Sequence, residues 1–421
     1  MKEDLLQFIW RYQLYNRNAL ATASGEELQI IHPGNWNKTD AGPDFENARI
    51  KIGRTEWAGH IELHVNSSDW QRHGHQGDRA YRNVILHVVF NDDGNGPPIP
   101  TLELQPRIKH LLIQNYEDLR QSLRDIPCAA QIDQINALTW VNWKSRLLAE
   151  RLEVKTERIR ARLIDTNYNW NQVFYEFLGY NFGLSKNGEA FLEITRRLPL
   201  NTLLKHKNNI LQMEALLFGT AGFLEKKHSD TYPKLLRKEF LFLRKKYKLA
   251  PISPVLWRFA TMRPAAFPTI RLAQFVQVLF QSESLFGDLL YIHDVTAIKE
   301  RFAYPASEYW DTHYTFDNEK SNRPKRIGAT TVENILINTI IPFKFLYGQR
   351  KQDQNLIQKS LQLLETIRPE KKSITKRWQA LGISIEHAFD SQALIYLRKQ
   401  YCAQFRCLHC QVGVQLLKQT T

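Results

Sequence analysis

The sequence contains no long run of apolar residues. Its most apolar window, ALLFGTAGFL at residues 215–224, is about half the roughly 20 residues that a membrane-spanning helix needs, and glycine interrupts it. The first residues, MKEDLLQFIWRYQLYN, place acids directly after the first Lys, unlike a secretory signal. We therefore expect a cytoplasmic protein without a membrane segment.

Several common enzyme signatures are also missing. The chain has no P-loop, no Rossmann glycine pattern, no GxSxG elbow and no HExxH helix. The usual nucleotide-binding and hydrolase motifs therefore do not explain its function.

Cysteine is scarce, with four in 421 residues. Three of them, Cys402, Cys407 and Cys410, have C-x4-C-x2-C spacing, and Cys128 lies far upstream. Disulfides are rare in cytoplasmic proteins, whereas four thiolates suit Zn²⁺ or an iron–sulfur cluster. We expect such a centre at these residues; the alternative is reduced thiols packed in a terminal helix.

Charge is distributed unevenly along the chain. Residues 1–125 hold 14 Lys and Arg against 17 Asp and Glu, whereas residues 126–421 hold 43 against 26. A basic region of this size favours a polyanionic partner, of which nucleic acid is the commonest. Solvated basic helix faces are the alternative explanation.

The pattern of apolar residues predicts an α+β protein with two domains. Short strand-like runs between residues 27 and 105 predict a small mixed sheet, largely antiparallel, with flanking helices in a module of residues 1–125. Helical periodicity dominates from there on and predicts a large, basic, all-α region in residues 126–421, with turns at stretches such as SKNGE, residues 185–189.

One strand of the predicted sheet carries potential metal ligands. Side chains alternate between the two faces of a strand, so His60, Glu62 and His64 share a face in TEWAGHIELHV. A hairpin through residues 52–55 brings Asp44, which follows Gly-Pro, beside Glu62. Two converging carboxylates repel each other unless a divalent cation lies between them.

This arrangement resembles the PD-(D/E)XK nuclease superfamily, in which a Pro-Asp opens a hairpin and (Asp/Glu)-X-Lys follows on the next strand. Here Pro43-Asp44 precedes Glu62-Leu63-His64, so a His replaces the Lys. The resemblance implies a restriction-endonuclease-like fold and Mg²⁺ or Mn²⁺ held by Asp44, Glu62 and the Leu63 carbonyl. The metal would activate water for attack on a phosphodiester, with His64 in the position of the Lys.

Other residues could add to this site or form a different one. Glu26 or Glu27, just before the first strand, could supply a further acid. His73, His75 and His87, together with His60 and His64, could build a centre for Zn, Mn or Fe. In a nuclease, His73, His75 and His87 would instead contact phosphate or shape the cleft.

Basic residues in the helical region could follow a phosphate backbone. The candidates lie in one long predicted helix: Lys155, Arg158, Arg160 and Arg162. Solvated helix faces are the alternative here too.

The combination of PGNWNKTDAGPDF, GHIELHVNSSDW, NVILHVV, LLFGTAGFL and CLHC resembles a bacterial family of domains of unknown function, nearly from end to end. Our leading hypothesis is a metal-dependent nuclease or nuclease-derived nucleic-acid-binding protein. One alternative is a non-catalytic scaffold that binds nucleic acid or a ribonucleoprotein. The other is a His-rich metalloenzyme acting on a small molecule.

Overall fold

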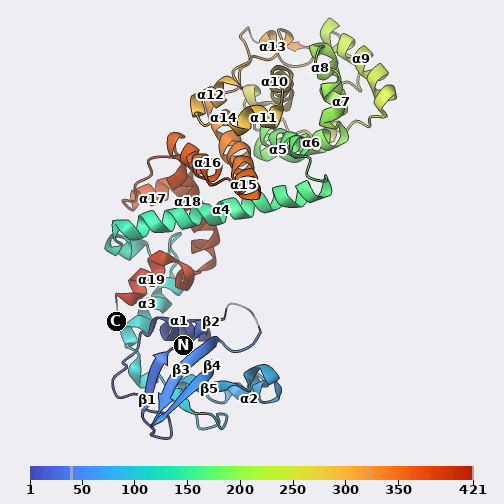
Figure 1. Cartoon of the computed structure of the whole chain (residues 1–421). Coiled ribbons are helices and arrows are strands. Elements are labelled where there is room, and N and C mark those ends of the chain that lie inside the picture. Colours follow the sequence, from blue (N-terminus) through green and yellow to red (C-terminus); the bar gives the residue numbers. More distant parts are fainter. Residues whose placement is uncertain (38–40, 321, 420–421) are drawn as a thin grey trace. The chain divides into compact units, whose positions relative to one another are not determined.

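A computed structural model describes residues 1–37, 41–320 and 322–419 (Figure 1). Lys38–Asp40 of the PGNWNKTDAGPDF stretch therefore lie outside the described residues. The chain divides into two compact units. The first comprises Met1–Trp143, Ala380–Gly382 and the chain from Ile395 onward, and the second comprises Lys144–Gln379 and Ile383–Leu394.

A mixed sheet forms the centre of the first unit. Its strands are β1 (Leu28–His32), β2 (Asn35–Trp36), β3 (Phe45–Ile52), β4 (Thr55–Asn66), β5 (Val84–Asn91) and β6 (Thr101–Glu103). The order is β1-β3-β4-β5-β6, with β2 also pairing with β3. Strands β1, β2 and β4 are antiparallel to β3, whereas β4, β5 and β6 run parallel to one another.

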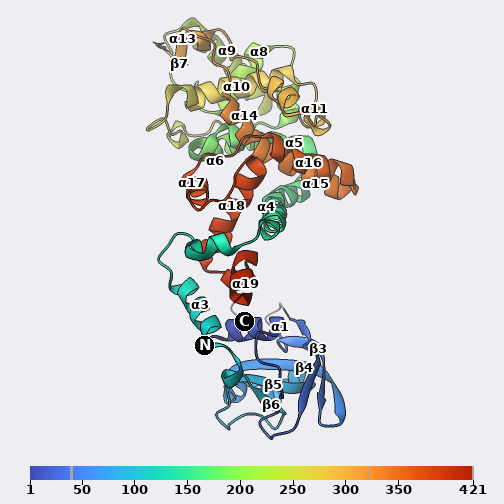
Figure 2. The same cartoon turned by 90° about the vertical axis from the view of Figure 1, so that its left-hand side faces the viewer.

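Helices complete the core of this unit. Helix α1 (Glu3–Tyr12) is amphipathic and packs against β4 (Figures 1 and 2). Its Leu6 and Ile9 are fully buried in the same apolar cluster as Ile50 and Leu63 of the sheet. Helices α3 (His110–Gln121) and α19 (Gln411–Lys418) bury residues in that cluster too. Burial of these apolar faces is the main force that holds the unit together.

The connection between β4 and β5 contains three short helical segments. These are α2 (Asp69–Arg72), η1 (His75–Gly77) and η2 (Arg79–Tyr81). A parallel pair of strands needs a crossover of this kind, because the chain must return to the end at which the first strand began.

The chain is almost entirely helical from α4 onward. The α-helices are α4 (Ala137–Asp165), α5 (Trp170–Phe182), α6 (Leu184–Arg197), α7 (Leu200–Leu204), α8 (Ile210–Thr220), α9 (Thr231–Tyr247), α10 (Pro268–Gln281), α11 (Leu285–Leu290), α12 (Val295–Glu300), α13 (Tyr309–Thr312), α14 (Ala329–Ile335), α15 (Ile341–Lys351), α16 (Gln354–Thr366), α17 (Ser373–Ala380), α18 (Ala388–Gln400) and α19. A short hairpin, β7 (His313–Thr315) and β8 (Asn318–Glu319), follows α13.

The α+β fold class is confirmed, with a mixed sheet followed by a large helical region. The turn predicted at residues 185–189 is wrong, because these residues lie inside α6. Gly188 is needed there for close packing: a Cβ at this position would come within 2.9 Å of the Tyr180 ring of α5. In the described part of the chain, no helix has the length and apolarity required to cross a membrane.

Candidate metal centre

Strand pairing brings Asp44 and Glu62 together. In the antiparallel register of β3 and β4, Phe45 lies opposite Ile61, so the residue before Phe45 lies beside the residue after Ile61. The backbone N–H of Asp44 donates to Glu62 Oε2 at 3.0 Å, and the N–H of Leu63 donates to Asp44 Oδ2 at 3.0 Å. Both carboxylates are therefore fixed by the hairpin backbone.

Helix α1 adds polar groups that the sequence did not lead us to expect. Gln7 Nε2 donates to Asp44 Oδ1 at 2.7 Å, and Glu3 is close enough to raise the pKa of both Asp44 and Glu62. Glu3 and Gln7 are four residues apart, so they share one face of the helix. The sequence spacing of Glu3 and Gln7 indicates that both side chains lie on one face of the helix, but it does not indicate which strand that face covers.

The two acids proposed from the sequence, Glu26 and Glu27, lie elsewhere. They precede Leu28, which pairs with Ile52 at the opposite end of β3 from Asp44. Seven residues of extended strand between Phe45 and Ile52 span roughly 23 Å. Neither acid therefore joins the carboxylate pair.

The carboxylate pair is electrostatically strained. Burial raises the pKa of Asp44 and of Glu62 above the ordinary range, and the charge on Asp44 raises the pKa of Glu62 further. Buried carboxylates in contact disfavour each other's ionised form, and a cation between them reverses this effect. The arrangement is therefore suited to binding a divalent cation.

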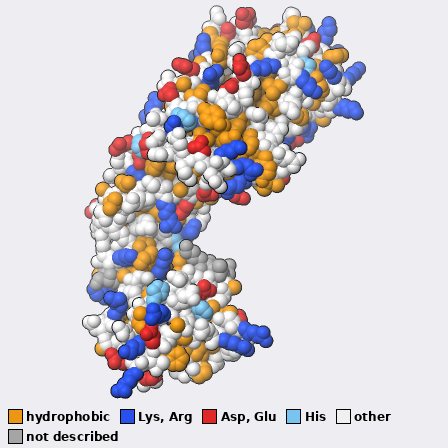
Figure 3. Space-filling model, viewed as in Figure 1, with side chains coloured by type: hydrophobic (Ala, Val, Ile, Leu, Met, Phe, Trp, Pro, Cys, Tyr) orange, Lys and Arg blue, Asp and Glu red, His pale blue; other side chains and the backbone are white. Residues whose placement is uncertain are grey.

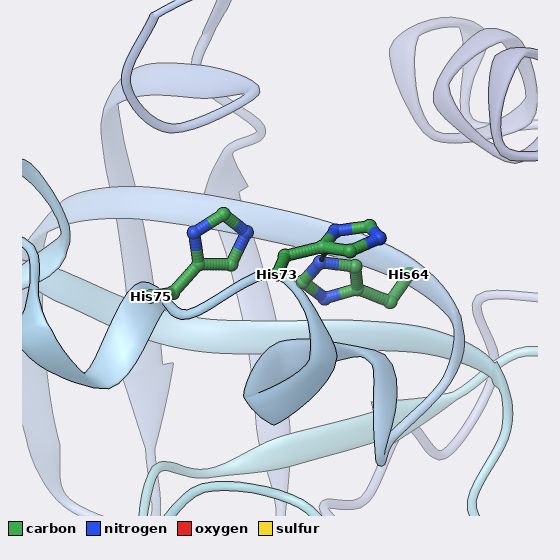
Figure 4. A group of neighbouring side chains, drawn as sticks. All are labelled: His64, His73 and His75. Atoms are coloured by element: carbon green, nitrogen blue, oxygen red, sulfur yellow. Dashed lines mark hydrogen bonds between the residues drawn. The ribbon is translucent and has the colours of Figure 1, made fainter.

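Four imidazoles lie beside the carboxylates. Among the described residues, His64, His73 and His75 form the only group of at least three potential ligands whose binding atoms all lie within 4.8 Å of one another (Figure 4). His64 Nε2 is 3.1 Å from His73 Nδ1, and His64 Nδ1 is 2.9 Å from His87 Nε2. His64 comes from β4 and His87 from its parallel neighbour β5, whereas His73 and His75 come from the connection between the two strands.

The carboxylates and the imidazoles form one continuous site. His75 Nε2 lies 3.3 Å from Glu62 Oε1, and His64 Nε2 lies 3.7 Å from the same oxygen. His75 Nε2 and His87 Nδ1 are buried, and neither has a hydrogen-bond partner within the described chain. Buried polar atoms of this kind are rare unless a ligand satisfies them.

Burial favours the neutral form of His64, His75 and His87. It lowers the pKa of His64 to about 2, with the neighbouring histidines adding to the effect, and it lowers the pKa of His87 to about 4. The pKa of His75 is also lowered by burial. Neutral imidazole is the form that binds metals.

Two aromatic side chains fix the imidazole rings. Trp70 meets the rings of His64, His75 and His87 edge to face, with centroids 5.4–6.3 Å apart. Tyr81 stacks on His75 at 3.8 Å, and its hydroxyl donates to the Gly42 carbonyl at 3.2 Å. This packing restricts the orientations of the rings.

His60 does not join the cluster, although it shares a strand face with Glu62 and His64. Residues four apart in a strand are roughly 13 Å apart, so His60 is too far from His64. Its ring instead accepts a long hydrogen bond from the backbone of Asn47 at 3.4 Å. Asn47 lies where the β3–β4 register shifts and has a positive φ of 57°.

The cysteines come together in the same unit, apart from the histidine cluster. Cys402, Cys407 and Cys410 are buried and Cys128 is partly buried. Cys128 and Cys407 both pack with the apolar core of the first unit.

The four predicted phosphate-binding residues lie in the second unit, and the structure gives three of them polar partners within the chain. Lys155 Nζ donates to Ile337 O and Asn338 Oδ1, Arg160 Nη2 donates to Gln349 Oε1, and Arg162 binds Glu176 through two hydrogen bonds. Arg158 lies over the Tyr180 ring. On the face in Figure 3, Lys and Arg side chains form separate groups with uncharged and acidic surface between them.

Taken together, the fold and the site define an α+β protein with a partly buried carboxylate–histidine site next to its parallel strands. Residues 3–373 match the family described as Protein of unknown function (DUF2851), and the chain belongs to that family. The predicted membership of a domain-of-unknown-function family is confirmed. No curated protein and no solved structure matches the chain.

Proposed function

We propose that the protein is a metal-dependent nuclease whose centre is the carboxylate pair of Asp44 and Glu62. The observation that carries this proposal is the convergence of buried Glu62 and partly buried Asp44 at the point where the β3–β4 hairpin meets parallel strand β5, with the Asp44 N–H bound to the Glu62 carboxylate. The order of elements supports the resemblance to the PD-(D/E)XK superfamily. Pro43-Asp44 leads into β3, and Glu62-Leu63-His64 lies on β4.

The residues present fit Mg²⁺ or Mn²⁺. Asp44 and Glu62 would supply carboxylate oxygens, and Glu3 and the Leu63 carbonyl are further candidates, because these cations prefer oxygen ligands. When bound, the cation would make a water molecule more acidic and offset negative charge on a phosphodiester.

The protein's own residues would orient the reactants. The N–H groups of Asp44 and Leu63 hold the two carboxylates, and His75 lies beside the other carboxylate oxygen of Glu62. His64 is neutral and hydrogen-bonded to two other imidazoles, so it contributes no permanent positive charge. His73 is exposed at the edge of the site.

Arginines next to the site could bind phosphate. Arg79 and Arg82 are exposed on the β4–β5 connection, the same segment that carries His73 and His75. Arg72 is exposed on this segment too, but it is paired with Asp69 at 2.8 Å. Contacts from these side chains to phosphate oxygens would position a nucleic acid without reading its sequence. We therefore place the nucleic-acid contact on this segment in preference to α4, where three of the four basic residues bind partners within the chain.

A second function is favoured by a different observation. The close approach of His64, His73 and His75 is suited to Zn, Mn or Fe, so the site could serve a metalloenzyme that acts on a small molecule. The two proposals differ in the dependence on His73. A carboxylate-bound Mg²⁺ does not require this residue, whereas a three-histidine centre does.

A cleavage assay tests the first proposal. With Mg²⁺ or Mn²⁺, the protein should cleave DNA or RNA, and Asp44→Asn or Glu62→Gln should each reduce the rate by about 100-fold or more, since even outer-shell changes at metal sites cost 10–100-fold. Glu27→Gln removes the same charge at the far end of β3 and should retain the activity.

His73→Ala separates the two proposals. It should lower Mg²⁺-dependent cleavage by less than about tenfold, whereas loss of most of the bound transition metal together with all activity would favour the three-histidine centre. Cleavage that survives Asp44→Asn would contradict the nuclease proposal. Binding of nucleic acid without cleavage under any of these metals would identify a non-catalytic scaffold.

A further inference from the structure

We propose that Cys128, Cys402, Cys407 and Cys410 form a four-thiolate metal centre in the first unit. The centre would join the chain around residue 128 to the C-terminal segment. It does not depend on the proposed nuclease function.

The backbone brings two distant segments to this place. Cys128 directly precedes η4 (Ala129–Gln134), and Cys410 directly precedes α19, which packs against η4. Cys402 and Cys407 are the first residues of η8 (Cys402–Gln404) and η9 (Cys407–His409). All four thiols thus sit at the beginning of a helical turn.

A tight turn connects two of the ligands. The N–H of Cys410 donates to the carbonyl of Cys407 at 3.2 Å, and the N–H of Val414 donates to the carbonyl of Cys410 at 2.8 Å. Gly413 allows this approach, because a Cβ there would come within 2.3 Å of the Cys407 carbonyl oxygen. The C-x2-C segment is therefore rigidly shaped.

The four thiols influence one another electrically. The pKa of Cys402 is raised first by burial and then by Cys410, Cys128 and Cys407, and the pKa of Cys128 is raised by burial and then by Cys410 and Cys407. Arg398 acts in the opposite direction on Cys402, as Arg120 does on Cys407.

Apolar packing alone explains the positions of the four cysteines poorly. A buried free cysteine often serves as a small apolar residue. Here, however, every cysteine of the 421-residue chain lies in the first unit, next to the packed elements η4 and α19 or on the short turns before α19, although the four come from segments separated by more than half the sequence. Four thiolates are a complete ligand set for one Zn²⁺ or for an iron–sulfur cluster.

Zn²⁺ and an iron–sulfur cluster require different spacings of the sulfur atoms. A tetrahedral Zn²⁺ site with bonds of about 2.3 Å places its sulfurs about 3.8 Å apart. Within the described chain, no three cysteine sulfurs all lie within 4.8 Å of one another. A cluster accepts wider spacing because its thiolates bind different iron atoms.

His409 provides a matched control. It lies between Cys407 and Cys410, but its ring stacks on Trp36 with centroids 5.6 Å apart. We therefore assign it to packing and not to the ligand set.

The test is the metal content of the full-length protein, purified without oxygen from cells supplied with iron and zinc. Iron with acid-labile sulfide would identify a cluster, and zinc without sulfide would identify a single ion. Either result supports the four-thiolate centre when the cysteine variants lose the metal, because the His64, His73 and His75 group could also hold zinc. Cys128→Ser and Cys410→Ser should each lose most of the metal and lower the melting temperature, whereas His409→Ala and Asp44→Asn should retain the metal.

Two results would overturn the proposal. One is a folded wild-type protein that contains neither metal nor sulfide and whose four thiols all react with an alkylating reagent under native conditions. The other is complete loss of the metal in His409→Ala. Both are independent of any nuclease assay, so a failure here is distinct from a failure of the proposed function.

Discussion

Both ring nitrogens of His64 take part in hydrogen bonds, Nδ1 with His87 and Nε2 with His73. A buried Lys at this position would need an anionic partner, whereas a neutral imidazole needs only a donor and an acceptor. Three further histidines and the Trp70 ring accordingly surround the neutral His64 ring.

A buried carboxyl group in the second unit leads to a prediction about pH. Glu214 is 1% exposed and accepts a hydrogen bond from Ser307 Oγ at 2.6 Å. Burial raises its pKa from 4.5 to about 7. The folded state holds this proton more tightly than the unfolded state. The contribution of protonated Glu214 to the free energy of unfolding is therefore fully present below pH 4.5 and is lost as pH rises through 7.

Denaturant unfolding of wild type and Glu214→Gln at several pH values checks this prediction. The wild type should lose stability relative to the variant as pH increases between these limits, by on the order of 3 kcal/mol in total. A stability difference that does not change over this range would show that Glu214 keeps an ordinary pKa.

At the scale of elements, α4 is fixed to α5 by an ion pair. Arg162 Nε and Nη2 donate to Glu176 at 2.7 and 2.9 Å, and the Glu176 side chain is fully buried. Arg160, two residues earlier, is paired only with acids whose side chains are at least half exposed. The two arginines look equivalent in the sequence, but they differ in the burial of their partners.

Replacement of each arginine by methionine tests this difference. Arg162→Met removes the positive charge and the two hydrogen bonds that stabilise the buried Glu176 carboxylate. It should lower the free energy of unfolding by about 3 kcal/mol. Arg160→Met should cost less than about 1 kcal/mol, as is usual for exposed pairs. Equal losses of stability, measured by urea denaturation, would contradict this assignment.

The elements themselves were largely predictable, because they depend on local patterns. The run TEWAGHIELHV corresponds to β4 within one residue, and the strand-like runs between residues 27 and 105 correspond to strands of the sheet. The error at residues 185–189 has a long-range cause: a glycine that reads as a turn is used for contact between α5 and α6.

Across the whole molecule, site residues could be predicted where they are close in sequence but not where their positions depend on long-range contacts. Asp44, Glu62 and His64 could be placed together because one hairpin carries all three. Glu3 could not be placed, because its position depends on the docking of α1 on β4. The partners of Lys155 and Arg162 likewise come from other parts of the helical region. The positive charge of Lys155 and Arg162 suggested a nucleic-acid partner, whereas the structure shows that both side chains bind partners within the chain.

The central claim is that Asp44 and Glu62 share a divalent cation. The most direct test is anomalous diffraction from a crystal of the full-length protein soaked in Mn²⁺. We predict a peak about 2 Å from one carboxylate oxygen of each residue. A peak bound only by the nitrogens of His64, His73 and His75, with none at the carboxylate pair, would contradict the claim.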